Sequence, residues 1–465
     1  MALKHEDLII DEKSPFSNCK LDRQKYADVL TSVIENYPSG FVLAINNKWG
    51  TGKTTFVKMW QQELINEEYE TIYFNAWEND FEDNPLTALV AELKALNPSD
   101  KVNLEKVIKS AAKLSKNVAP ALVKALLNKY IDSEIFVEAL ENSVKSAGDI
   151  FEKEIEDYAD KKKSITDFRT NLLNYVSKNS RRKPLIFIID ELDRCRPNYA
   201  VSLLEQVKHF FSVSNIVFVL SIDKEQLGNA ICGVYGSDKI DTNEYLRRFI
   251  DIEYSIPPPQ NGEFINYLYE YFDFDSFLNS PDRKKIPEFK SDGRTFITTC
   301  KVLLGHSNLR MLEKVLSNTR LALRTLKYSS YLVPEFFVFL IFLKYNHNNF
   351  YQDLINKKYS LEIAHDNFYK IILPFMDTTN LNLFTQIEAL FLVYYRNYIS
   401  EYTTGKEIFE YDSVISNNKL NVHSKIDDDA LLYYFTHEHD VRRTFSLELS
   451  HFTNKIELVE SFKTI

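Results

Sequence analysis

A short run of glycines, threonines and one lysine, lying between an apolar stretch and a helical pattern, has the composition of a phosphate-binding loop. Residues 47–55 read N-K-W-G-T-G-K-T-T, which fits the spacing G-x-x-x-x-G-K-[ST] except that Asn47 stands at the first glycine. Such a loop turns backbone N–H groups toward phosphate oxygens and needs residues that accept a positive φ. Asn accepts a positive φ more readily than most residues, so we expect Asn47 to replace the glycine without loss of function.

The residue types in this loop have separate parts in binding a triphosphate. Lys53 supplies a cation for the β- and γ-phosphates, and Thr54 offers a hydroxyl to Mg²⁺ at the N-terminus of the following helix. Trp49 is expected to pack on the core below the loop or to cover the nucleotide. The predicted nucleotide-binding residues of this segment are Asn47, Trp49, Gly50, Thr51, Gly52, Lys53, Thr54 and Thr55.

Two consecutive acidic residues follow the apolar run at 185–189. A buried strand that ends in a carboxylate would place Asp190 beside Thr54, where it can hold the water shell of Mg²⁺. Glu191, the next residue, can polarise the attacking water and is the predicted catalytic base, with Lys53 as a second catalytic residue. The two segments have the Walker A and Walker B patterns.

Each pattern alone also has an ordinary structural explanation. A glycine-rich turn between a strand and a helix can carry an exposed lysine, and a strand that emerges into solvent often ends in acidic residues. Their joint occurrence, each at the end of a predicted strand, favours a site for ATP or GTP with Mg²⁺.

Apolar runs of strand length alternate with helical patterns in the first half of the chain. Strands are predicted at 41–45, 70–75, 185–189, 216–222 and 250–256. The alternation predicts an α/β fold, a P-loop NTPase core with a mostly parallel sheet flanked by helices. A helical insertion is predicted between the two nucleotide motifs, and an all-helical region after the prolines at 257–259.

The predicted organisation has five parts. Residues 1–99 and 184–257 form the two parts of the NTPase core, and residues 100–183 form the insertion between them. Residues 258–330 are expected to form a helical lid and residues 331–465 a C-terminal helical domain.

The chain resembles the KAP family of P-loop NTPases, within the larger group that includes the AAA+ and STAND ATPases. The resemblance extends over residues 22–314 and rests on L-D-R at 21–23, K-W-G-T-G-K-T at 48–54, F-N-A-W at 74–77, I-D-E-L-D-R-C at 189–195, the strand before Asp223, and Y-L at 245–246. Family members often carry transmembrane helices in the insertion, whereas residues 101–180 contain no apolar run of that length. The resemblance therefore implies a soluble member, and it also implies a role in bacterial anti-phage defence.

Three residues outside the two motifs have a functional and a structural explanation. Asp223 resembles a position that senses the γ-phosphate, and it fits the N-cap of the next helix equally well. Arg248, beside Arg247, and Arg310 in the predicted lid are candidates for an arginine that reaches the γ-phosphate. For each arginine, a solvated or carboxylate-paired side chain is the alternative.

Composition and charge exclude several classes of protein. The net charge of −10 argues against general affinity for nucleic acid, although a local basic patch would still bind it. Four cysteines without paired spacing are typical of a reducing compartment, so a cytoplasmic protein is expected. The apolar run at 331–343 would span only ~20 Å as a helix, against ~30 Å of bilayer hydrocarbon, so it is predicted to be a core helix.

The leading hypothesis is a Mg²⁺-dependent NTPase that acts as a nucleotide-driven switch or assembly ATPase. ATP is favoured because no N-K-x-D motif follows the Walker B strand. A homo-oligomer or a partner effector protein is expected. A nucleotide-stabilised oligomeric scaffold with little turnover is the alternative, and a small-molecule kinase is a third, less favoured one.

Overall fold

The chain forms two compact units, one from residue 8 to residue 258 and one from residue 259 onward. The computed structural model describes residues 8–82, 84–96, 100–117, 147–179, 183–209, 213–258, 261–400, 408–412, 417–437 and 446–461.

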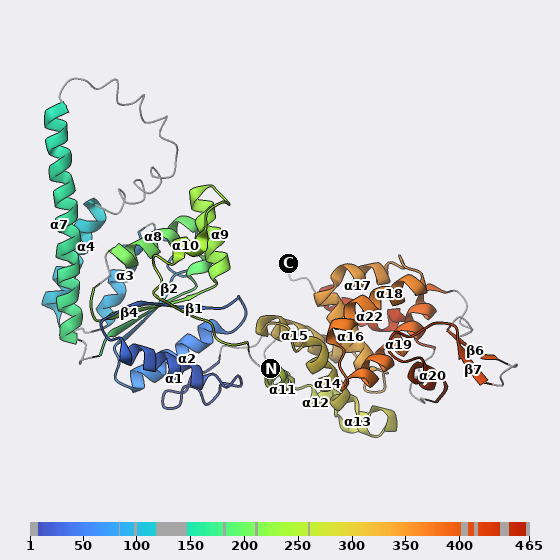
Figure 1. Ribbon diagram of the computed structural model, residues 1–465. Coiled ribbons are helices and arrows are strands. Elements are labelled where there is room, and N and C mark those ends of the chain that lie inside the picture. The colour runs from blue at the N-terminus through green and yellow to red at the C-terminus, as the bar shows by residue number, and fades with distance from the viewer. Residues whose placement is uncertain are drawn as a thin grey trace. The chain divides into compact units, whose positions relative to one another are not determined.

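A parallel sheet of five strands forms the centre of the first unit (Figure 1). Its order is β2-β3-β4-β1-β5, and every neighbouring pair is parallel. The strands are β1 Val42–Asn46, β2 Thr71–Asn75, β3 Leu185–Asp190, β4 Ile216–Ile222 and β5 Ile252–Tyr254. Every residue of β3 and β4 is buried, as continuous apolar strands covered on both faces should be. The predicted α/β fold with a parallel sheet is confirmed.

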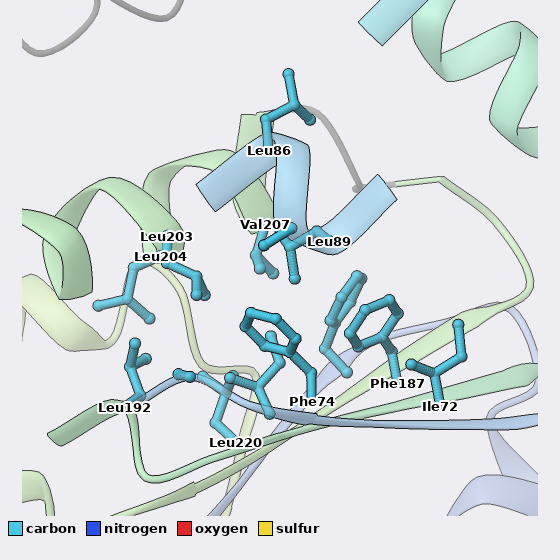
Figure 2. Close-up of a cluster of buried hydrophobic side chains, with 14 of the residues drawn as sticks. Ile72, Phe74, Leu86, Leu89, Phe187, Leu192, Leu203, Leu204, Val207 and Leu220 are labelled. Carbon is cyan, nitrogen blue, oxygen red and sulfur yellow. The ribbon is translucent and has the colours of Figure 1, made fainter. Parts of the chain in front are cut away.

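Helices cover both faces of this sheet (Figure 1). Because side chains alternate along a strand, Ile45 and Ile188 belong to the core beneath α1 (Gln24–Asn36) and α2 (Lys53–Asn66). The opposite face packs against α3 (Pro85–Glu92), α8 (Pro197–His209) and α9 (Lys224–Tyr235). Figure 2 shows side chains that meet in this second core, among them Ile72, Phe74, Leu86, Leu89, Phe187, Leu203, Leu204, Val207 and Leu220.

A helical insertion interrupts the sheet between β2 and β3, as predicted. It contains α4 (Lys101–Asn117) and the long α7 (Ala147–Asn179), which pack against each other. Phe168 and Tyr175 of α7 are buried in the core beside α3, and the Tyr175 hydroxyl donates to the Leu93 carbonyl at 2.9 Å. The rest of the predicted insertion, residues 118–146, lies outside the described residues.

The second unit is built mainly of helices. Its long apolar segment forms α16, buried on all sides through eleven consecutive residues from Pro334 to Lys344, as expected of a core helix. None of the helices in the described ranges combines the length and the apolar character that a bilayer crossing requires. The helices are α11 Asn261–Tyr271, α12 Asp275–Leu278, α13 Pro281–Lys284, α14 Asp292–Leu304, α15 Leu309–Arg324, α16 Pro334–Asn346, α17 Asn348–Ile355, α18 Leu361–Ile372, α19 Leu381–Ile399, α20 Asp428–His437 and α22 Leu449–Ser461.

One short hairpin was not predicted in this helical unit. Strands β6 (Phe409–Asp412) and β7 (Asn417–Leu420) pair in antiparallel fashion. Their sequences, F-E-Y-D and N-N-K-L, are short and mostly polar, so they lack the apolar alternation by which strands are recognised. The boundary at residue 330 between a lid and a terminal domain stays a prediction, and α14 packs against α16 across it.

Candidate nucleotide site

The two predicted nucleotide motifs leave the sheet at the same edge. In the register of the strands, Ser221 on β4 is level with Ile45 on one side and with Asp190 on the other. One strand, β4, therefore separates the start of the phosphate loop from Asp190, and the strands on its two sides, β1 and β3, lie about 10 Å apart. Asn75 on β2 extends the same row beyond Asp190. This edge is where open parallel sheets bind their ligands.

Two glycines give the phosphate loop its curvature. Gly50 and Gly52 have φ values of 77° and 79°, in the left-handed region that favours glycine. Helix α2 begins directly after Gly52, so Lys53, Thr54 and Thr55 form its first turn. The Thr54 side chain is half-buried and that of Thr55 is exposed. The Thr51 hydroxyl donates to the Lys48 carbonyl at 2.8 Å, within the loop.

The explanation offered above for Asn47 is wrong. Asn47 is not among the residues with positive φ. Its side-chain amide instead donates to the Ile256 carbonyl at 2.7 Å and accepts from the Ile256 N–H at 2.9 Å. Its own backbone N–H donates to the Ile222 carbonyl at 3.1 Å. Asn47 thus ties the start of the loop to the last residue of β4 and to Ile256, which follows β5, and a glycine could make only the backbone bond to Ile222.

Lys53 is buried and points into its own loop. The ammonium group donates to the carbonyl oxygen of Asn47 and, at 3.3 Å, to that of Lys48. Burial lowers the pKa of Lys53, and the nearby carboxylates, Asp193 foremost, act in the opposite direction. A cation that is poorly hydrated and held by neutral carbonyls is well prepared to bind an anion.

Arg23 forms hydrogen bonds with the backbone of the phosphate loop, a contact that the sequence did not reveal. Its guanidinium donates to the carbonyl oxygens of Thr51 at 2.6 Å and Gly52 at 3.1 Å, and the residue is only 4% exposed. In a trans peptide the N–H points opposite to the carbonyl. Fixing these two carbonyls therefore turns the N–H groups of Gly52 and Lys53 away from Arg23. The only signal in the sequence was the L-D-R segment before the first helix.

Asp190 is almost completely buried at the end of β3. One of its oxygens accepts from the Glu191 N–H at 2.9 Å and the other from the Tyr73 hydroxyl at 2.9 Å. Burial and the neighbouring Asp190 raise the pKa of Tyr73, so its phenol stays a donor. Tyr73 was also missed, although it lies two residues before Asn75 and hence on the same face of β2.

Glu191 sits in a left-handed conformation, with φ of 60°, on the turn that leads into η2 (Leu192–Arg194). Its Oε1 forms an ion pair with Arg194 Nη1 at 2.8 Å, and the Asn75 side chain also donates to its carboxylate. Burial raises the pKa of Glu191, with Arg194 acting against this shift. A carboxylate of this kind binds a proton more strongly than a solvated one, which suits a general base.

Asp223 is the N-cap of α9, as the structural explanation of this residue expects. Its carboxylate accepts from the Gln226 N–H at 3.3 Å. The other oxygen accepts from the Trp49 N–H at 3.2 Å, so the cap also touches the phosphate loop. Trp49 does not pack into the core, since it is 40% exposed, and its indole N–H donates to Asp193.

The two candidate arginines lie in different compact units. Arg248 follows α10 (Thr242–Leu246), is exposed, and its side chain has no hydrogen bond or ion pair with the described part of the chain. Arg310 is the second residue of α15 and is also exposed. The catalytic role of each stays a prediction.

The donor set at the sheet edge fits Mg²⁺, which prefers oxygen ligands. The Asp190 carboxylate and the Thr54 hydroxyl supply two such groups, at the end of β3 and the start of α2. The Ser221 hydroxyl, level with Asp190, is fully buried and has no hydrogen-bond partner among the described residues. A buried hydroxyl is usually hydrogen-bonded, so the Ser221 oxygen beside Asp190, unpartnered within the described ranges, fits a site that takes a further polar group.

Two solved structures are similar to this chain at low scores. One is the ORC2 protein of Aeropyrum pernix in ADPNP and ADP complexes, with 12% identity, 95% of each chain covered and a TM-score of 0.31. The other is a DNA replication initiation factor, with 13% identity, 98% of each chain covered and a TM-score of 0.27. At these scores neither likeness bears on the fold or the function of this chain. No curated protein sequence matches it.

The family assignment rests on the segment that holds both motifs. Residues 23–335 match the KAP family P-loop domain, and this segment spans Arg23, the phosphate loop, Asp190, Glu191 and Arg310. The match covers more than half of the 465 residues. The chain therefore belongs to the KAP family of P-loop NTPases.

Proposed function

We propose that this protein is a Mg²⁺-dependent ATPase that acts as a nucleotide-driven switch or assembly ATPase. The proposal depends on one observation: the phosphate loop and the Asp190–Glu191 pair leave the same edge of the sheet, with a single strand between them. A phosphate held by the loop would then lie within reach of the acidic pair.

The residues have complementary parts in this proposal. Lys53 and the loop N–H groups bind the β- and γ-phosphates, because they provide a cation and oriented donors at the N-terminus of α2. Thr54 and Asp190 would hold Mg²⁺, which when bound neutralises charge on the phosphate oxygens. Glu191, the residue after Asp190, orients and deprotonates water through its half-buried carboxylate.

The finer parts of the function rest on the sequence and the family. ATP is favoured over GTP because the chain lacks an N-K-x-D motif after β3. A cytoplasmic location, assembly with further copies or with an effector protein, and a part in bacterial anti-phage defence are proposals of the same standing. The helical unit after residue 259 is proposed to respond to the γ-phosphate.

Binding and phosphate release, measured side by side, test this function. Lys53→Ala should abolish ATP binding, whereas Glu191→Gln should keep binding and lose phosphate release. Two exposed residues provide matched controls, Lys163→Ala on α7 and Glu225→Gln on α9, and both should behave as the unaltered protein.

The same experiment separates the alternatives. ATP-dependent growth in mass by light scattering, without phosphate release, would favour the scaffold. Phosphate found on an added small molecule instead of in solution would favour a kinase. Hydrolysis that persists unchanged in both Lys53→Ala and Glu191→Gln would remove the ATPase proposal.

A further inference from the structure

Trp49 has an unusual position for the largest side chain in a phosphate loop. Trp49 is 40% exposed, so its ring does not lie in the core. Its two N–H groups are nevertheless both engaged: the indole N–H donates to Asp193 Oδ2, and the backbone N–H donates to Asp223 Oδ2 at 3.2 Å. The hydrogen bond to Asp193 therefore fixes the polar end of this side chain, while part of the ring remains in solvent.

Asp193, the acceptor of this bond, lies on the turn that carries the proposed base. It is the middle residue of η2, two residues after Glu191, and only 8% exposed. Its carboxylate also accepts the backbone N–H of Asp223, and it is the carboxylate that most favours the charged form of Lys53 by raising its pKa. A buried carboxylate needs such partners, and here they come from the phosphate loop and from Asp223, the residue that follows β4.

The bond between Trp49 and Asp193 therefore joins the two halves of the site through side chains. Trp49 lies between Asn47 and Gly50 in the proposed phosphate-binding loop, and Asp193 belongs to the turn after Glu191. The strands that carry these segments are not neighbours, because β4 lies between them. Without this bond, the two segments would be joined here only through Asp223, whose carboxylate accepts from the Trp49 N–H and whose own N–H donates to Asp193. A displacement of 1 Å at reacting atoms can lower a rate by about 100-fold.

We propose that Trp49 and Asp193 are positioning residues for hydrolysis: their hydrogen bond fixes the turn of Glu191 against the phosphate loop. Neither residue touches the reacting atoms in this proposal. The inference rests on the proposed ATPase function and deepens it, since it assigns to Trp49 and Asp193 an effect on the rate of turnover and not on the affinity for nucleotide.

A double-mutant cycle tests this coupling. Trp49→Phe removes the indole N–H and keeps an aromatic ring, so it should lower kcat about tenfold, the scale of one hydrogen bond to a charged group, with KM for ATP changed less than threefold. Asp193→Ala, which removes the acceptor of the indole N–H, should lower kcat at least as much. In the Asp193→Ala background, Trp49→Phe should have no further effect, because its partner is already lost.

Each other outcome overturns the proposal. Equal losses from Trp49→Phe in both backgrounds would show that the two residues act independently, and a rise in KM without a fall in kcat would assign Trp49 to nucleotide binding. Asp193→Leu, which also lacks an acceptor, replaces Asp193→Ala in the cycle if the latter does not fold, as judged by its melting curve. The exposed Asp238→Asn should leave kcat unchanged.

Lys53→Ala and Glu191→Gln, measured alongside, separate this proposal from the one on which it rests. If both variants release phosphate as the unaltered protein does, the ATPase proposal itself fails. If Glu191→Gln is inactive and the cycle shows no coupling, only the role of Trp49 and Asp193 is refuted.

Discussion

Replacing Arg23 by alanine should weaken ATP binding by about 10- to 100-fold, although Arg23 lies beneath the loop and is not a ligand in the proposed site. The guanidinium holds the Thr51 and Gly52 carbonyls at 2.6 and 3.1 Å. A hydrogen bond that involves a charged group contributes ~1.5–3 kcal/mol. If the loop loses one such contribution to its ordering, the Kd for ATP rises by about 10- to 100-fold.

Calorimetric titration with ATP and Mg²⁺ measures the effect. Arg23→Lys keeps the charge but offers a point donor instead of a planar fork, so its Kd should lie between those of the alanine variant and the unaltered protein. Arg169→Ala is a matched control, because Arg169 also makes two hydrogen bonds to backbone, at 3.0 and 2.6 Å to the His209 carbonyl, away from the loop. Its Kd should not change.

The melting curve of each variant decides what a negative result means. If Arg23→Ala melts at a lower temperature but binds ATP with an unchanged Kd, Arg23 serves folding only. Its two hydrogen bonds would then have no part in orienting the loop N–H groups for nucleotide.

Three further predictions follow from other residues. Burial raises the pKa of Glu205 to about 7, so the folded state favours the neutral carboxyl group. The contribution of this group to the free energy of unfolding is therefore fully present below its ordinary pKa of 4.5 and is lost as pH rises through 7. Glu205→Gln should therefore stabilise the protein by up to about 3 kcal/mol at pH 8 and by almost nothing at pH 4.5, in denaturant titrations, and equal effects at both pH values would contradict this. Asn47→Gly, which restores the usual glycine, should lower stability by ~1–3 kcal/mol through the lost bonds to Ile256, and an unchanged melting temperature would refute this. If Arg248 or Arg310 acts on a neighbouring subunit, its alanine variant should lose about 1,000-fold in kcat and regain activity when mixed with Glu191→Gln protein.

The strands and their alternation with helices could be predicted because the signal is local. The continuous apolar runs of β3 and β4 and the glycines at 50 and 52 each imply their own conformation. The hairpin formed by β6 and β7 escaped prediction, since its short polar strands carry no such local signal.

The contacts that complete the site join residues distant in the sequence, and no local pattern reveals them. Asn47 bonds to Ile256, which is 209 positions away, and Tyr73 bonds to Asp190 across 117 positions. The conformational preference of asparagine suggested a positive φ for Asn47, which the structure does not show. The side chain instead bonds to Ile256, a partner that only the folded sheet brings close. Arg23 could have been suspected only from its place in a family motif.

A crystal structure of Glu191→Gln protein with ATP and Mg²⁺ would show whether the two motifs form one nucleotide site. We expect the triphosphate inside the loop at 47–55, with Lys53 Nζ on its β- and γ-oxygens and a metal ion bonded to the Thr54 hydroxyl near Asp190. A nucleotide bound elsewhere, with Lys53 still on the carbonyls of its own loop, would contradict this arrangement.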